Sequence, residues 1–373
     1  MDFQLDDEQT AIADLSGRIL TEQVTPDRLR ELEADAEWFD RSTWTELAKA
    51  DLLGICLPES VGGGGYGLFE ATLVCEQIGR TVAPVPYFAT IVLGALAIAE
   101  HGSNDLQAEL LPAVASGDLV LTAALTEGLG GLPPTQPSTT ATADGDGWRL
   151  TGEKTFVPAA HLAGRILVPA ATGDGESTVF VVDPSDESVV IEVESSTNLE
   201  PLATVRLDGV AVDAGAVLGA VGEGARITGW IADRAIAALC ATQAGVCEGA
   251  LRLTAGYVSE REQFGTKIAT FQAVAQRVAD AYIDTEAVRL TARQAAWRLG
   301  EGLDAAESLA IAKTWAADGA DRVVHAAQHL HGGIGLDVDY PVHRYFRWAR
   351  HVGLALGGSS THLRRLGDLI AAG

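Results

Sequence analysis

The chain has 373 residues, of which 47% are hydrophobic and 21% are charged, a composition typical of a globular protein with two or three domains. Its formal net charge of −25 argues against binding to nucleic acid or to an anionic lipid surface, because both need clustered Lys and Arg. The longest uncharged apolar run, residues 87–99, is shorter than the roughly 20 residues that a membrane-spanning helix needs.

The N-terminal residues and the cysteines indicate the cellular location and the redox state that we expect. Residues 1–10 lack the basic and apolar regions of a signal peptide, so we expect a cytoplasmic protein. The cysteines have neither metal-ligand nor redox spacing, which predicts buried, reduced thiols and no metal site. They are Cys56, Cys75, Cys240 and Cys247.

Residues 1–118 show the periodicity of helices. Ser42 is expected to cap a helix that runs to Gly54. Further helices are predicted near 69–79, 90–101 and 106–114.

Composition changes near Gly117. Short β-branched runs separated by Gly, Asp and Pro follow as far as residue 222, which predicts a small antiparallel sheet or barrel. Within it, Pro133, Pro134 and Pro137 predict a loop over residues 128–142.

The remainder is helical again. Helices predicted near 225–262, 270–299, 304–330 and 341–372 are each long enough to bury an apolar stripe, as in a four-helix bundle. The expected fold is therefore α+β and multidomain. It consists of an N-terminal α-helical domain (1–118), a middle β-barrel domain (119–224) and a C-terminal four-helix bundle (225–373).

The first two of these helices meet within the stretch YVSEREQFGTKIATFQ, residues 257–272. Gly265 is expected to end the first helix, because glycine adopts the left-handed conformation easily. Arg261, Phe264 and Gln272 would then surround one sharp corner, where a cation, an aromatic ring and an amide could hold a phosphate and a ring. A purely structural explanation also exists, since Arg is favoured near a helix C-terminus and Phe in a core.

A second stretch, QHLHGGIG at residues 328–335, has paired glycines that would let the backbone approach a ligand closely. Together the two stretches resemble the acyl-CoA dehydrogenase family, FAD enzymes that desaturate acyl-CoA thioesters. Other motifs resemble the family in the same order along nearly the whole chain. They are LPESVGGGGYGLFEATLVCEQIGR (57–80), ALTEG (124–128) and GDGWRLTGEKTFV (145–157). The resemblance implies FAD as the cofactor and the same order of helical domain, β-barrel and helical bundle.

The resemblance also implies what the chain lacks. Family chemistry removes a proton from the carbon next to the thioester, which needs a carboxylate as the base. The position that carries this Glu in most members is Gly357 here, and the position used by other members is Ala235. Asp233 is near the second position, but a two-residue offset on a helix turns a side chain by about 200°.

The flavin-ring pocket of the family is also incomplete in this sequence. Pro158 stands where members have a hydroxyl residue that bonds the ring, and GLGGLPPTQ replaces the usual Gly-Ser-Asp turn after ALTEG. In this family each FAD crosses a subunit boundary, and the neighbour's share of the site is matched here. The matching residues are Arg261, Phe264, Gln272, Gly332 and Gly333, with His329 in the place of the usual Gln and Gln328 beside it.

The chain resembles the β-type subunits of α2β2 acyl-CoA dehydrogenases that act on CoA esters of steroid (cholesterol) side chains in β-oxidation. We therefore expect a non-catalytic subunit that completes the FAD site of a catalytic partner, while the partner binds most of the acyl-CoA. Two alternatives stay open. One is a self-sufficient homotetramer with a relocated base such as Asp233, and the other is a structural relative that binds no flavin.

Overall fold

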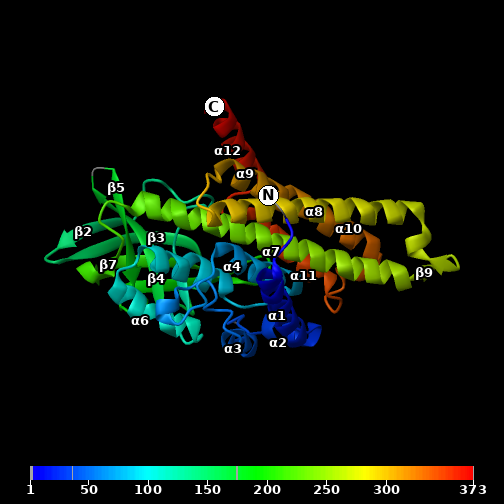
Figure 1. Cartoon of the computed structure of the whole chain (residues 1–373), viewed down its shortest axis with the longest axis horizontal. Helices are drawn as coiled ribbons and strands as arrows, with labels where there is room; N and C mark the ends of the chain where they lie inside the picture. Colours follow the sequence, from blue (N-terminus) through cyan, green and yellow to red (C-terminus); the bar gives the residue numbers. More distant parts are fainter. Residues whose placement is uncertain (1–2, 36, 174, 373) are drawn as a thin grey trace. The chain divides into compact units, whose positions relative to one another are not determined.

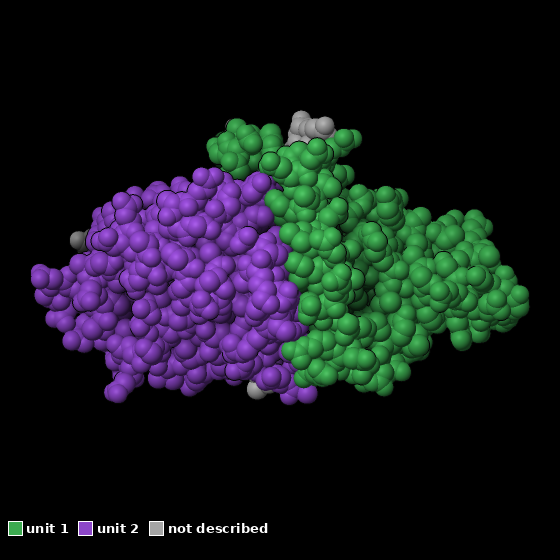
Figure 2. Space-filling model, turned by 60° about the horizontal axis from the view of Figure 1, so that its bottom comes forward, with its two compact units in different colours: residues 1–31, 72–83, 236–373 green, residues 32–71, 84–235 purple. Residues whose placement is uncertain are grey.

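The computed structural model describes residues 3–35, 37–173 and 175–372. The chain forms two compact units (Figure 2). Unit 1 comprises residues 1–31, 72–83 and 236–373, and unit 2 comprises residues 32–71 and 84–235. The three-domain division at residues 118 and 224 stays a prediction.

Helices dominate the first third of the chain, as expected. They are α1 (Asp7–Gln23), α2 (Pro26–Glu33), α3 (Arg41–Lys49), α4 (Leu68–Thr81), a π-helix at Phe88–Ala95, α5 (Leu96–His101) and α6 (Asn104–Ala115). The predicted cap was wrong, because Ser42 lies inside α3 and its hydroxyl donates to Asp40 at 2.7 Å. Asp40 is the N-cap, since its carboxylate also accepts from the backbone of Thr43. The helix ends at Lys49 rather than Gly54.

The middle of the chain forms one eight-stranded sheet in the order β6-β7-β3-β2-β4-β5-β8, with β1 on β4. The strands are β1 (Leu121–Ala123), β2 (Thr140–Asp144), β3 (Gly147–Pro158), β4 (Arg165–Gly173), β5 (Glu176–Val182), β6 (Val189–Ser195), β7 (Pro201–Val212) and β8 (Val217–Leu218). The expectation of an antiparallel sheet was wrong for β1, which pairs with β4 in parallel, and for the contact of β2 with β4, whereas β2 pairs with β3 antiparallel as expected. Neither is joined to β4 by a hairpin turn, and only such a turn would impose the antiparallel direction.

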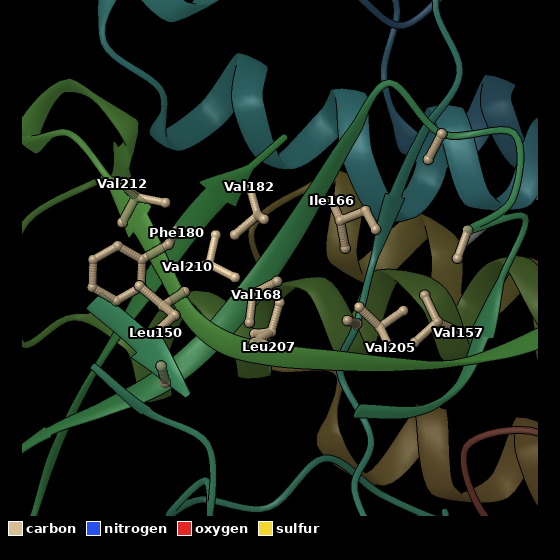
Figure 3. Packing of buried hydrophobic residues seen from close by; sticks show 14 of the residues in the cluster. Leu150, Val157, Ile166, Val168, Phe180, Val182, Val205, Leu207, Val210 and Val212 are labelled. Atoms are coloured by element: carbon tan, nitrogen blue, oxygen red, sulfur yellow. The ribbon is translucent and has the colours of Figure 1, made fainter. Parts of the chain in front are cut away.

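Side chains from β3, β4, β5 and β7 form the core of this sheet (Figure 3). Leu150, Ile166, Phe180 and Val205 within it are completely buried. β7 was not among the predicted strands, although its inward side chains alternate with outward ones. Gly209, at φ 71°, adds one residue to this strand opposite β3 and interrupts the alternation.

Long helices fill the rest of the chain. They are α7 (Gly224–Glu260), α8 (Gln272–Gly300), α9 (Ala306–Thr314), a π-helical turn at Trp315–Gly319, α10 (Ala320–His331), α11 (Val342–Leu354) and α12 (Ser359–Ala372). The predicted helix over 341–372 was wrong, because Leu356 (φ 52°) and Gly357 (φ 93°) are left-handed and divide it into two. Among the described residues, no helix combines the length and the apolar character that crossing a membrane requires.

Candidate functional site

The connection between α7 and α8 is a small β-hairpin (Figure 1). Strand β9 (Glu262–Gln263) pairs antiparallel with β10 (Thr266–Lys267). Phe264 and Gly265 form the turn with φ of 56° and 76°, the left-handed pair that a type I′ turn requires. The prediction that Gly265 ends the first helix was therefore wrong. The helix already ends at Glu260, and Gly265 serves the hairpin turn instead.

Phe264 is held in this turn with its side chain 95% exposed. Its ring meets that of Phe271 edge-on, with centroids 6.3 Å apart. A left-handed backbone costs an ordinary L-residue about 1–2 kcal/mol, and such strain is concentrated at ligand sites and switches. The strained backbone at Phe264 therefore holds an aromatic ring in solvent at a cost in folding free energy.

The hairpin register places two further polar side chains next to the turn. Gln263 lies opposite Thr266, and directly opposed residues share one face of a hairpin. Sequence reasoning missed them, because strands of two residues leave no recognisable period. The guanidinium of Arg261 is exposed and has no ion-pair partner within the described residues, which leaves it available to an anion. Gln272 is the exposed first residue of α8.

The second motif follows the end of α10. Gly332 has φ 61° and ψ −137°, a conformation that glycine alone adopts readily. A Cβ built on Gly332 or Gly333 would have no atom within 4 Å, so the backbone of this turn is open to a ligand. His329 is exposed, while Gln328 packs against Gly335.

The fold brings the two motifs together, although about 70 residues of sequence separate them. The hydroxyl of Tyr257 donates to the carbonyl of His331 at 3.4 Å, and the two rings stack with centroids 4.5 Å apart. Tyr257 belongs to the last turns of α7, and His331 directly precedes Gly332.

Both expected base positions are unsuited to proton abstraction. Gly357 is buried, and a Cβ built on it would lie 3.0 Å from Cγ2 of Thr361 and 3.3 Å from Nε2 of His362. Ala235 is completely buried. The sequence contains no Asp or Glu between Asp339 and Asp368, so a shift in alignment of a few residues does not supply a carboxylate either.

Two buried titratable groups shape the segment around Gly357, and sequence reasoning missed both. Nζ of Lys313 donates to the carbonyls of Val352 and Gly353, each at 2.9 Å, and thereby binds the last carbonyls of α11. Burial lowers the pKa of Lys313 to about 8. The only sequence indication for His362 was its place in the same segment as Gly357.

His362 cannot replace the missing carboxylate. Its side chain is completely buried, and Nε2 faces the carbonyl of Leu356 at 3.0 Å, so this nitrogen carries the proton. Burial lowers the pKa of His362 to about 4. A buried group of such low basicity is a poor acceptor for a carbon-bound proton. Its contact with Leu356 is a structural one.

The strand pair of the middle sheet offers few polar groups to a flavin ring. Pro158 lacks an N–H, and the hydroxyl of Thr126 is already used because it donates to the carbonyl of Thr155. Nearby, Glu127 accepts from Nζ of the buried Lys154 at 2.6 Å. Burial alone would raise the pKa of Glu127, but hydrogen bonds from Lys154 and Ser138 lower it to about 2. The available donors therefore fit part of an FAD at the hairpin, and they do not fit its ring at Pro158.

Comparison with known proteins identifies the family. Models of the N-terminal, middle and C-terminal domains of acyl-CoA dehydrogenases match residues 6–118, 122–210 and 222–370. The chain is 39% identical to the acyl-CoA dehydrogenase FadE27 of Mycobacterium tuberculosis, over 100% of this chain and 99% of FadE27.

Two solved structures are also similar over nearly their whole length. The steroid ACAD Tcur3481-Tcur3483 matches with 44% identity and a TM-score of 0.90 over 98% of both chains. The ChsE4-ChsE5 complex from Mycobacterium tuberculosis matches with 39% identity and a TM-score of 0.94 over 100% of both chains. The chain therefore belongs to the acyl-CoA dehydrogenase family of FAD-dependent oxidoreductases.

Proposed function

We propose that this chain is the non-catalytic subunit of a heteromeric acyl-CoA dehydrogenase and completes the FAD site of a catalytic partner. One contrast carries the proposal. The hairpin presents a strained, exposed Phe264 and an Arg261 that has no ion-pair partner in the part of the chain that the structure describes, whereas the base positions Gly357 and Ala235 hold no carboxylate.

The chain's own residues would contribute binding and no proton transfer. Arg261 would pair with a phosphate of the partner's FAD, and Phe264 would contact one of its rings. The turn at Gly332 and Gly333 would let backbone N–H groups approach the same ligand. In this family FAD accepts the hydride from the substrate. The partner would supply the carboxylate that removes the proton.

The partner would also bind most of the substrate. Residues 32–71 and 84–235 hold 28 Asp and Glu but 8 Lys and Arg, which disfavours binding of the anionic CoA moiety by this unit. The names of the similar structures, a steroid ACAD and a two-protein complex, favour a steroid side-chain CoA ester as the substrate class and an α2β2 assembly.

Purification of the chain alone and with its partner tests the proposal. Flavin and acyl-CoA desaturation are expected only in the complex, and Arg261→Ala should reduce both. Arg277→Ala is the matched control, because Arg277 on α8 is also exposed and has no ion-pair partner among the described residues. This substitution should change little.

Two outcomes would contradict the proposal. A yellow isolated chain that desaturates acyl-CoA would indicate the self-sufficient enzyme with a relocated base such as Asp233. A complex whose flavin content is indifferent to Arg261→Ala would indicate a structural relative that binds no flavin.

A further inference from the structure

Three aromatic rings connect the two halves of the candidate site. We call Tyr257, His331 and Tyr340 the ring cluster. The rings of Tyr257 and His331 stack at 4.5 Å with an interplanar angle of 26°. Tyr340 lies 5.1 Å from the ring of His331 and 6.2 Å from that of Tyr257. The end of α7, the end of α10 and the segment before α11 therefore meet at this cluster.

His331 is held in one orientation within the cluster. Its side chain is 3% exposed, and Nδ1 faces the carbonyl of Ala327 at 2.7 Å. A carbonyl can only accept a hydrogen bond, so Nδ1 carries the proton and Nε2 has a free lone pair. Among the described atoms, this buried Nε2 has no hydrogen-bond partner. The imidazole ring of His331 is thus neutral and fixed to α10. Its Nε2 acceptor receives no hydrogen bond from the described atoms.

The cluster lies next to the groups that would meet the flavin. Tyr257 precedes Arg261 by four residues, about one helical turn of α7. His331 directly precedes Gly332. A change in how Tyr257 and His331 stack would therefore move Arg261 and the Gly332 turn relative to each other.

We propose that His331 is a positioning residue for flavin binding. Through its stack on Tyr257 it sets the place of the Gly332 turn relative to Arg261, and it does not itself contact the cofactor. This inference rests on the proposed function above. The stack requires a flat ring at this position, whereas the imidazole nitrogens do not take part in it, so Phe should replace His331 with little loss.

A titration of the heteromeric complex tests this role. The complex is stripped of flavin and titrated with FAD, with flavin fluorescence as the signal. His331→Ala should weaken FAD binding by about tenfold, since an aromatic pair is lost. His331→Phe should stay within about threefold of the unmodified complex, because its ring can still stack on Tyr257. Assembly, measured alongside, should be unchanged in both, whereas the urea unfolding midpoint should fall in His331→Ala, because that substitution removes a buried ring. The FAD titration is therefore made without denaturant, where both variants are folded.

Tyr257→Leu provides a second test that leaves His331 in place, and it should weaken FAD binding to the same extent. Combined with His331→Ala, it should cause no further loss, because both remove one interaction. Unchanged FAD affinity in both single variants would overturn the inference, and so would an equal loss in His331→Phe and His331→Ala. If Arg261→Ala still weakens binding in that case, the proposed function survives. No effect of Arg261→Ala would overturn the proposed function itself.

Discussion

Replacement of Phe264 by Asn should stabilise the hairpin and weaken cofactor binding at the same time. Phe264 occupies a left-handed position at φ 56°, which costs an L-residue about 1–2 kcal/mol, whereas Asn before Gly is favoured in a type I′ turn. Since the ring is 95% exposed, little buried area is lost. The edge contact with Phe271 offsets part of the gain. The net stabilisation should be about 1 kcal/mol.

Amide hydrogen exchange measures this gain locally. The N–H of Ile268 donates to the carbonyl of Arg261 at 2.9 Å and closes the hairpin. In Phe264→Asn its exchange should slow by about fivefold, the equivalent of about 1 kcal/mol. Gly265→Ala is the matched control. Its added Cβ meets no atom within 4 Å, but φ 76° strains it, so exchange should accelerate.

The affinity of the complex for FAD should fall in the same variant, although the hairpin becomes more stable. Loss of a stacking ring costs about 1–3 kcal/mol, so the FAD affinity of the complex should fall by about fivefold or more in Phe264→Asn. If FAD affinity is unchanged, the exposed ring does not serve the cofactor and the argument from strain to function fails. Faster exchange at Ile268 would instead show that the estimate of backbone strain is wrong.

Two further predictions concern the segment near the missing base. Gly357→Glu should not produce acyl-CoA desaturation by the isolated chain, because φ 93° and a contact at 3.0 Å with Thr361 prevent an L-side chain from fitting without rearrangement. Measurable turnover in this variant would show that the segment around Gly357 can accommodate a glutamate side chain. His362 should make stability depend on pH. Its folded-state pKa of about 4 lies below the ordinary histidine value of 6.5, so the unfolded chain binds a proton that the native chain does not between these values. The free energy of unfolding should therefore fall by about 3 kcal/mol as the pH drops from 6.5 to 4. His362→Gln should remove this dependence in urea titrations, and an identical pH profile in both proteins would contradict the burial of the imidazole.

Long-range periodicity made much of the fold predictable. Helices such as α7 and α8 run over many turns without a proline, so their existence and approximate bounds follow from the sequence. Short elements were not accessible in this way. The hairpin between α7 and α8 has strands of two residues, set by the turn at Phe264 and Gly265. Such a turn leaves no period to detect.

Predictions also failed where neighbours with similar chemistry compete. Asp40 and Ser42 are both good helix caps, and only the structure shows that the carboxylate of Asp40 takes the role. The break between α11 and α12 lies at the left-handed Leu356 and Gly357, and Lys313, which is distant in sequence, binds the final carbonyls of α11. The contact of Lys313 has no local signal, whereas Gly357 and Gly358 do indicate a helix end, which sequence reasoning missed.

The missing base and the exposed groups of the hairpin are best explained together. A chain with no carboxylate at Gly357 or Ala235 and few free donors near Pro158 gains nothing in its own active site from an exposed, strained Phe264. Arg261, at the start of the same hairpin, is exposed and has no ion-pair partner among the described residues. The cost of holding both groups in solvent is explained if their ligand lies on another subunit. The same reasoning extends to His331, whose buried, unsatisfied Nε2 is tolerated because its ring keeps Arg261 and the Gly332 turn in place for that ligand.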